Sequence, residues 1–281
     1  MTTYLLTNGL PIPNNFPVDN YETIHSLVSS KRDHTNTNEF LFFLASWKGF
    51  LHRFLACTDH NEKYIEAITL VGEDPSNHER YLVERELFNF WVNGLAAIEC
   101  LCCALFAIGA IKEIAEIEQT TNTTFRINND NDIKKISPTT TAEKFYSKFG
   151  DIPITTILKD LFDTVSTKED ARQYKEWKKV RDILAHRGHP GRRIALSSGR
   201  PEKVPDLLNF YSLTKEGAKD VPIIEITSNT TASMHEWLTK IIDNILGAAY
   251  TFVDNFSVES ELLAMPLPSE QLSQPLNEES T

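Results

Sequence analysis

The sequence predicts an all-α protein, an up-and-down helical bundle with a long polar loop and a small β-containing insertion near its C-terminal end. Three observations favour this fold class. Apolar residues recur at helical spacing through most of the chain, and β-like runs occur only after residue 190. The 281 residues are also enough to bury a substantial core without disulfides or a structural metal.

The N-terminal half is predicted to contain helices of very different lengths. Residues 1–38 form an extension with a short helix over 19–31. The run EFLFFLASWKGFLHRFLAC, residues 39–57, is apolar nearly all round, which predicts a helix packed on several sides. A short helix is expected over 61–70, and the longest helix over about 78–119.

The most apolar part of the longest helix, Phe88–Ile111, has the length of a membrane span. It contains Asn93 and Glu99, however, and a carboxylate at the bilayer centre costs about 2.5–3.5 kcal/mol. Gly94 and Gly109 would instead let neighbouring helices approach it closely. The N-terminus also lacks the positive charge and apolar run of an export signal. We therefore expect a core helix in a cytoplasmic protein that does not contact a membrane.

Four cysteines are present, and three of them, Cys100, Cys102 and Cys103, crowd within the apolar helix. Neighbouring residues on one helix point in different directions and cannot easily form a disulfide. No second ligand pair stands at the spacing of a known metal motif, so we expect core residues and predict no metal site. The sequence has no glycine-rich phosphate loop and no G-x-S-x-G motif, and we predict no cofactor.

The C-terminal half is predicted to alternate short helices with two irregular segments. The polar loop 120–141 offers few residues that could anchor it. The insertion 190–230 contains two β-like runs, 192–197 and 221–227, that could pair as a flap over one end of the bundle. The helices between and after these segments are expected over 142–150, 153–166, 167–187 and 232–255. The helical domain therefore spans 39–256, and 257–281 form a disordered acidic tail.

Charge is distributed unevenly along this half of the chain. The chain carries a formal charge of −11, yet residues 168–203 contain eleven Lys or Arg against five Asp or Glu. Such segregation is typical of a protein that binds a polyanion, because the acidic remainder discourages indiscriminate binding. The alternative is a solvated helix face whose bases pair with acidic residues elsewhere in the fold.

The apolar side of the predicted helix over 167–187 includes one residue that does not fit. Arg181 lies at the margin of the arc that carries Trp177 and Val180. A guanidinium there needs a carboxylate, a phosphate or a carbonyl as partner. Glu99, a lone acid in the apolar helix, also needs a partner: it could be an acid of a functional pocket, or it could pair with Arg181, which we give as a hypothesis.

A second stripe of the same helix carries Asp182 and His186, which stand four residues apart and are neighbours on the helix surface. A carboxylate beside an imidazole can orient it and favour its charged form.

The run RDILAHR, residues 181–187, resembles the R-x4-H signature of the HEPN superfamily, helical-bundle proteins of defence and toxin systems. Asp182 supplies the polar residue that the family prefers after the arginine, and the likeness covers about 39–187 plus the final helix. The resemblance implies metal-independent RNA cleavage that leaves a 2',3'-cyclic phosphate. His186 would transfer protons, Arg181 would bind the scissile phosphate, and Asp182 would support the imidazole.

RNA is thus the expected partner of the basic segment, and an antitoxin or regulatory protein is a possible second one. The residues expected to contact RNA beside the catalytic set are Lys175, Lys178, Lys179, Arg187, His189, Arg192 and Arg193.

Helical geometry places a condition on the Arg181–His186 pair. Residues five apart on a helix differ by about 140°, so these two side chains do not share a face. Either the helix unwinds near His186, or a second subunit supplies its own pair across a two-fold axis. The superfamily is known for the second arrangement, and we predict a homodimer.

Two other functions are compatible with the same residues. The chain resembles equally a non-catalytic HEPN-like module that binds nucleotide, RNA or a protein partner. It is also compatible with a helical scaffold in which Arg181 only anchors the fold.

Overall fold

The computed structural model describes residues 3–5, 11–30, 37–71, 76–116, 124–163, 165–186, 191–197, 200–214, 217–225 and 228–255. Within these residues the protein is predominantly helical, with eight helices, so the predicted helical character is confirmed. For the strands after residue 190 and for His186, only the backbone is described.

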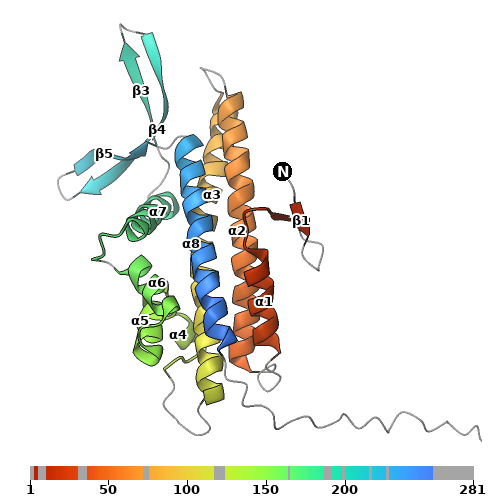
Figure 1. Cartoon of the computed structure of the whole chain (residues 1–281). Coiled ribbons are helices and arrows are strands. Elements are labelled where there is room, and N and C mark those ends of the chain that lie inside the picture. The colour runs from red at the N-terminus through yellow and green to blue at the C-terminus, as the bar shows by residue number, and fades with distance from the viewer. Residues whose placement is uncertain are drawn as a thin grey trace, which may run out of the picture.

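Two long antiparallel helices form the centre of the bundle (Figure 1). They are α2 (Asn38–Leu70) and α3 (Asn77–Glu116), and α1 (Val18–Ser29) and α8 (Ser228–Asp254) pack beside them. The expected break between 57 and 61 was wrong, because α2 is continuous. Its polar residues there, Thr58 and Asn61, are buried and face the interior of the bundle instead of a turn.

Length and composition alone would allow two of these helices to cross a membrane, α2 and the part Asn77–Ile114 of α3. In their most apolar windows, 44% and 78% of the residues respectively are buried inside the protein. A core helix of a soluble protein passes the same test. The polar residues Glu86 and Asn93 of α3 have hydrogen-bond partners within the bundle, as buried polar groups in a protein core require.

Short helices cover one side of α3 and α8 (Figure 1). They are α4 (Asp130–Ile133), α5 (Pro138–Phe149), α6 (Pro153–Phe162) and α7 (Glu169–His186). The N-terminal residues add a small antiparallel hairpin, β1 (Thr3–Leu5) with β2 (Pro11–Pro13).

The expectation that 120–141 is a poorly anchored loop was wrong for residues 124–141. Phe125 is buried, and its ring occupies the space that a side chain at Gly109 would fill. Glu113, only 1% exposed, accepts hydrogen bonds from the backbone N–H groups of Thr124 (2.8 Å) and Phe125 (2.9 Å). Lys148 lies 3.2 Å from the same carboxylate. A single buried acid on α3 therefore fixes the segment.

We expect Glu113→Gln to lower the free energy of unfolding by about 2 kcal/mol. Both carboxylate oxygens accept charge-assisted hydrogen bonds from backbone N–H groups, whereas glutamine has one oxygen and places its NH2 group where the other oxygen accepted. Urea denaturation measures this loss, with Glu143→Gln on the exposed side of α5 as control. Equal stability of the two variants would contradict the anchoring role of Glu113.

The insertion after α7 forms a three-stranded antiparallel sheet, β3 (Gly191–Ser197), β4 (Arg200–Thr214) and β5 (Gly217–Glu225). The two β-like runs seen in the sequence lie in β3 and β5, but each pairs with β4 and not with the other. The register of β3 on β4 shifts between Arg192 and Ile194, so residues 204–207 of β4 have no register partner in β3. Pro205 lies in this irregular part of β4, where a sheet tolerates proline. The same proline weakens the strand pattern of residues 200–214 in the sequence.

Candidate functional site

The position of α7 is set by Trp177. Its side chain is fully buried, and its Nε1 donates a hydrogen bond to the carbonyl of Trp91 at 2.8 Å. The indole lies against Gly94, where a Cβ would be 2.0 Å from Cζ2 of the ring. The close approach expected at Gly94 is therefore confirmed. One turn further along α7, Arg181 reaches the exposed margin of α3.

The Arg181 guanidinium is held by two carboxylates. Its Nη2 lies 2.9 Å from Oε1 of Glu99 on α3, which confirms the expected pair, and its Nε lies 3.3 Å from Oδ1 of Asp182. The three side chains are exposed to 22%, 43% and 41%, so solvent reaches the group. Arg181 is thus fixed in orientation but not sealed in the core.

The electrostatics of the group are mixed. Burial raises the pKa of Glu99, Asp182 raises it further, and the positive charges of Arg181 and Lys178 lower it. The burial effect prevails, and the pKa of Glu99 is above its ordinary value. Because these side chains are partly exposed, another anion can also reach the guanidinium of Arg181.

The structure bears on the Arg181–His186 geometry through the backbone. α7 remains helical through His186, its last residue, so the helix does not unwind before the histidine. The side chain of His186 lies outside the described residues. Asp182 was expected to support the imidazole of His186. In the structure its carboxylate contacts Arg181.

The remaining predicted RNA-contacting residues are placed in part. Lys175, Lys178 and Lys179 are exposed on α7, and Nζ of Lys175 donates to the carbonyl of Ser166 at 3.0 Å. Arg187 and His189 lie outside the described residues. Arg192 and Arg193 belong to β3, of which only the backbone is described.

Two polar groups between α2 and α3 were not predicted. Nδ1 of His60 lies 2.6 Å from Oε2 of the buried Glu86, whose Oε1 accepts from Nε of Arg85 at 2.7 Å. Further along, Nη1 of Arg53 donates to Oδ1 of Asn93 at 2.8 Å. Asn93 stood out in the sequence as a polar residue in an apolar helix, but its partner lies 40 residues away and has no sequence signal.

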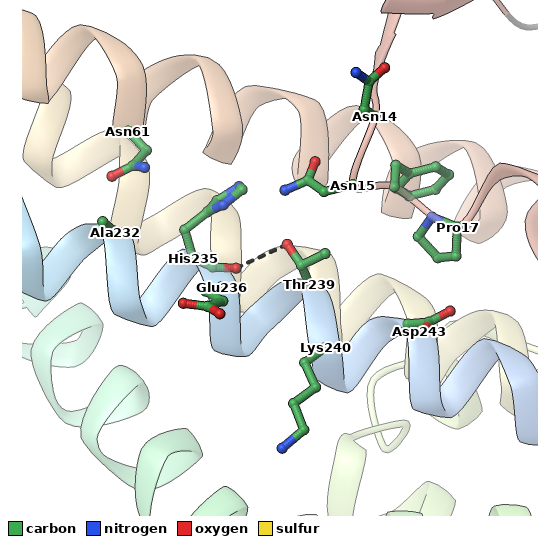
Figure 2. Close-up of a pocket in the computed structure, with 11 residues that line it drawn as sticks. Asn14, Asn15, Pro17, Asn61, Ala232, His235, Glu236, Thr239, Lys240 and Asp243 are labelled. Carbon is green, nitrogen blue, oxygen red and sulfur yellow. Dashed lines mark hydrogen bonds between the residues drawn. The ribbon is translucent and has the colours of Figure 1, made fainter. Parts of the chain in front are cut away.

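A cleft of about 620 Å³ lies on the other side of α8 (Figure 2). Its walls come from residues 14–17, from Asn61 on α2 and from residues 232–243 of α8. Trp237 packs on Trp177 of α7, whereas His235, two residues earlier, contacts Thr58 of α2. Since residues two apart on a helix point about 200° apart, the cleft is separate from the Arg181 group.

His235 is a buried titratable residue that lines this cleft (Figure 2). Its Nε2 lies 2.8 Å from the Thr58 hydroxyl, which itself donates to the carbonyl of Phe54 at 3.2 Å. The hydroxyl must therefore accept from Nε2–H, which fixes the tautomer of the neutral ring. Burial lowers the pKa of His235 to about 4, so the ring is neutral at physiological pH.

Comparisons of the chain with protein-family models, with curated proteins and with solved structures found no match. The chemistry available at the end of α7 follows from its own residues. It comprises a fixed, partly exposed guanidinium, a carboxylate on each side of it, and exposed lysines on the same helix. The planar donors of an arginine suit a phosphodiester, and here two carboxylates already accept from some of them.

Proposed function

We propose that the protein is a HEPN-like, metal-independent endoribonuclease of the cytoplasm that acts as a homodimer. The observation that carries the proposal is Arg181, oriented by Glu99 and Asp182 at the exposed margin of α3, five residues before the helix ends at His186. An arginine held in this way is preorganised to bind a phosphate at low entropic cost.

The proposed reaction is an intramolecular transesterification. The 2'-hydroxyl oxygen of the RNA forms a bond to phosphorus while the bond from phosphorus to the 5' oxygen breaks. The products are a 2',3'-cyclic phosphate and a free 5'-hydroxyl. His186 removes the proton of the 2'-hydroxyl or supplies one to the leaving oxygen, and Arg181 stabilises the charge that accumulates on the phosphoryl oxygens.

The Glu99 carboxylate must yield for Arg181 to bind RNA. Ion pairs between side chains that remain partly exposed contribute only about 0–1 kcal/mol. Glu99 is 43% exposed, so this range applies to its pair with Arg181. A phosphodiester with several additional contacts therefore competes successfully for the guanidinium.

A homodimer brings the two groups together. Arg181 and His186 lie about 140° apart around α7, which stays helical between them. Across a two-fold axis, Arg181 of one subunit can face His186 of the other. The exposed lysines beside the site also offer a surface to which an antitoxin or regulatory protein could bind and so block cleavage.

A non-catalytic HEPN-like module that binds nucleotide, RNA or a protein partner is the second candidate. The ion pair between Arg181 and Glu99 favours it, because the guanidinium already has a partner and can serve the fold alone. In that protein RNA would be retained by the basic segment without being cut.

One assay separates these functions. Purified protein is incubated with mixed RNA in EDTA, alongside His186→Ala and Arg181→Ala. His52→Ala and Lys63→Ala are matched controls, because both residues are exposed on α2, and Lys63 pairs with Asp59 outside the basic segment 168–203. We expect the wild type and both controls to cut, and both site variants to fall to the level of RNA without protein.

The other outcomes assign the alternatives. RNA retention without cutting supports the binding module, and neither cutting nor retention supports the scaffold. Unfolding of Arg181→Ala, seen by circular dichroism, would show that the structural role of Arg181 dominates. A strict monomer by light scattering would contradict the shared site.

A further inference from the structure

Asn93 is a buried polar residue that the proposed reaction does not use. It is 6% exposed, and an unpaired amide at such a position costs about 1–3 kcal/mol. Both ends of its amide are paired. Nδ2 donates to the carbonyl of Asn89 at 2.8 Å, and Oδ1 accepts from Nη1 of Arg53 at 2.8 Å. The amide is thus locked by its own helix and presents a fixed acceptor to Arg53.

Arg53 is held differently from other arginines of the bundle. Arg85, Arg172 and Arg181 each pair with a carboxylate, whereas within the described part of the chain Arg53 donates to the neutral amide of Asn93. Because the Asn93 amide is neutral, it does not cancel the positive charge of Arg53. The Arg53 side chain is also exposed on α2. An arginine that is fixed in position but keeps its charge and most of its donors is suited to binding an anion.

The position of Arg53 relates it to the Arg181 group. Its partner Asn93 precedes Glu99, the partner of Arg181, by six residues on α3, about 9 Å along the helix axis. Cys100 is within reach of both charges: burial raises the pKa of its thiol, Arg53 lowers it and Glu99 raises it. Cys100 and Ala96 are half-buried, so small side chains fill the surface between the two guanidiniums.

We propose that Arg53 binds a second phosphate of the RNA strand whose scissile phosphate binds Arg181, so that the strand crosses α3 from α7 towards α2. This inference rests on the proposed RNA-directed function and adds a positioning residue to it. Asn93 and Glu99 lie about 9 Å apart along the α3 axis and about 120° apart around it, so the two guanidiniums are more than one nucleotide step apart. The second phosphate is therefore a few nucleotides away from the bond that is cut.

The proposal predicts a dependence on substrate length. A ribodinucleoside monophosphate has one phosphodiester and cannot reach both arginines, whereas a twelve-nucleotide RNA can. We expect Arg53→Ala to lower kcat/KM on the longer RNA by about three- to tenfold and to leave cleavage of the dinucleotide unchanged. In filter binding with His186→Ala as background, the slope of log affinity against log salt should become shallower by about one.

The controls use residues of similar exposure. Lys63→Ala, whose lysine pairs with Asp59 on α2, and His52→Ala, at an exposed position of the same helix, should leave the length dependence and the salt slope as in the wild type. Circular dichroism verifies that Arg53→Ala folds, because the change removes the partner of Oδ1 of the buried Asn93.

Three results would overturn the proposal. One is an unchanged salt slope for Arg53→Ala, and another is an equal loss on both substrates. The third is dissociation of the dimer in Arg53→Ala, which would assign Arg53 to contacts between subunits. If the wild type binds RNA without cutting it, the salt slope still tests Arg53 while cleavage by Arg181 and His186 is refuted. If the wild type neither binds nor cuts RNA, both proposals fall together.

Discussion

Gly94→Ala is expected to lower the free energy of unfolding by about 2–4 kcal/mol, although alanine is the better helix former. The new Cβ would lie 2.0 Å from Cζ2 and 2.8 Å from Cε2 of Trp177. The indole has little freedom to move, because it is fully buried and its centroid lies about 5 Å from those of Phe90 and Trp91. Any shift also strains its hydrogen bond to the carbonyl of Trp91.

Gly247→Ala on α8 is the matched control. No heavy atom lies within 4 Å of the Cβ that this change adds, so helix propensity alone decides its effect. We expect a gain of about 0.5–1 kcal/mol. Urea denaturation compares the two variants, and a Gly94→Ala protein as stable as Gly247→Ala would contradict the close packing of α7 on α3.

The Gly94 contact also matters for the Arg181 group. Trp177 sets the position of α7 on α3, and Arg181 follows it by about one turn of the same helix. Displacing the indole therefore moves the guanidinium away from Glu99. The residue that allows the contact, a glycine in a long helix, was recognisable in the sequence, whereas the tryptophan that it receives was not.

The pairing of Arg181 with Glu99 could be predicted because both residues violate the pattern of their own helix. A charge on an apolar face needs a partner, and two such charges of opposite sign in a bundle satisfy each other. The same reasoning did not reach Arg53, because an arginine on an exposed helix face violates no pattern. Its role depends on Asn93, and amides accept many partners.

The segment after residue 120 shows why other features could not be predicted. Its sequence has neither helical nor strand periodicity, and of its described residues 124–141 only Phe125, Ile127 and Thr141 become buried. Phe125 lies against Gly109, and Thr141 donates to the carbonyl of Cys102. The cleft in Figure 2 likewise joins three segments that are separated by more than 40 residues each. Contacts of this kind depend on how helices pack and leave no local signal.

His235 should make the stability of the protein depend on pH. Burial lowers its pKa to about 4, whereas the unfolded chain has a value near 6.5. The unfolded state therefore binds more protons between these values. Stability is complete above about pH 6.5 and falls as the pH drops towards 4, with an expected loss of about 2 kcal/mol between pH 7 and pH 5.

His235→Gln isolates this contribution, because the glutamine amide can still donate to the Thr58 hydroxyl but does not titrate. The variant should lose much less stability than the wild type between pH 7 and pH 5, as measured by urea denaturation at each pH. The carboxyls of Glu86 and Glu113, whose pKa values are lowered by their hydrogen-bond partners despite burial, titrate below this window. His52→Gln, at an exposed position, should keep the wild-type pH dependence. A His235→Gln profile parallel to that of the wild type would mean that the imidazole gains its proton without opening the contact between α2 and α8.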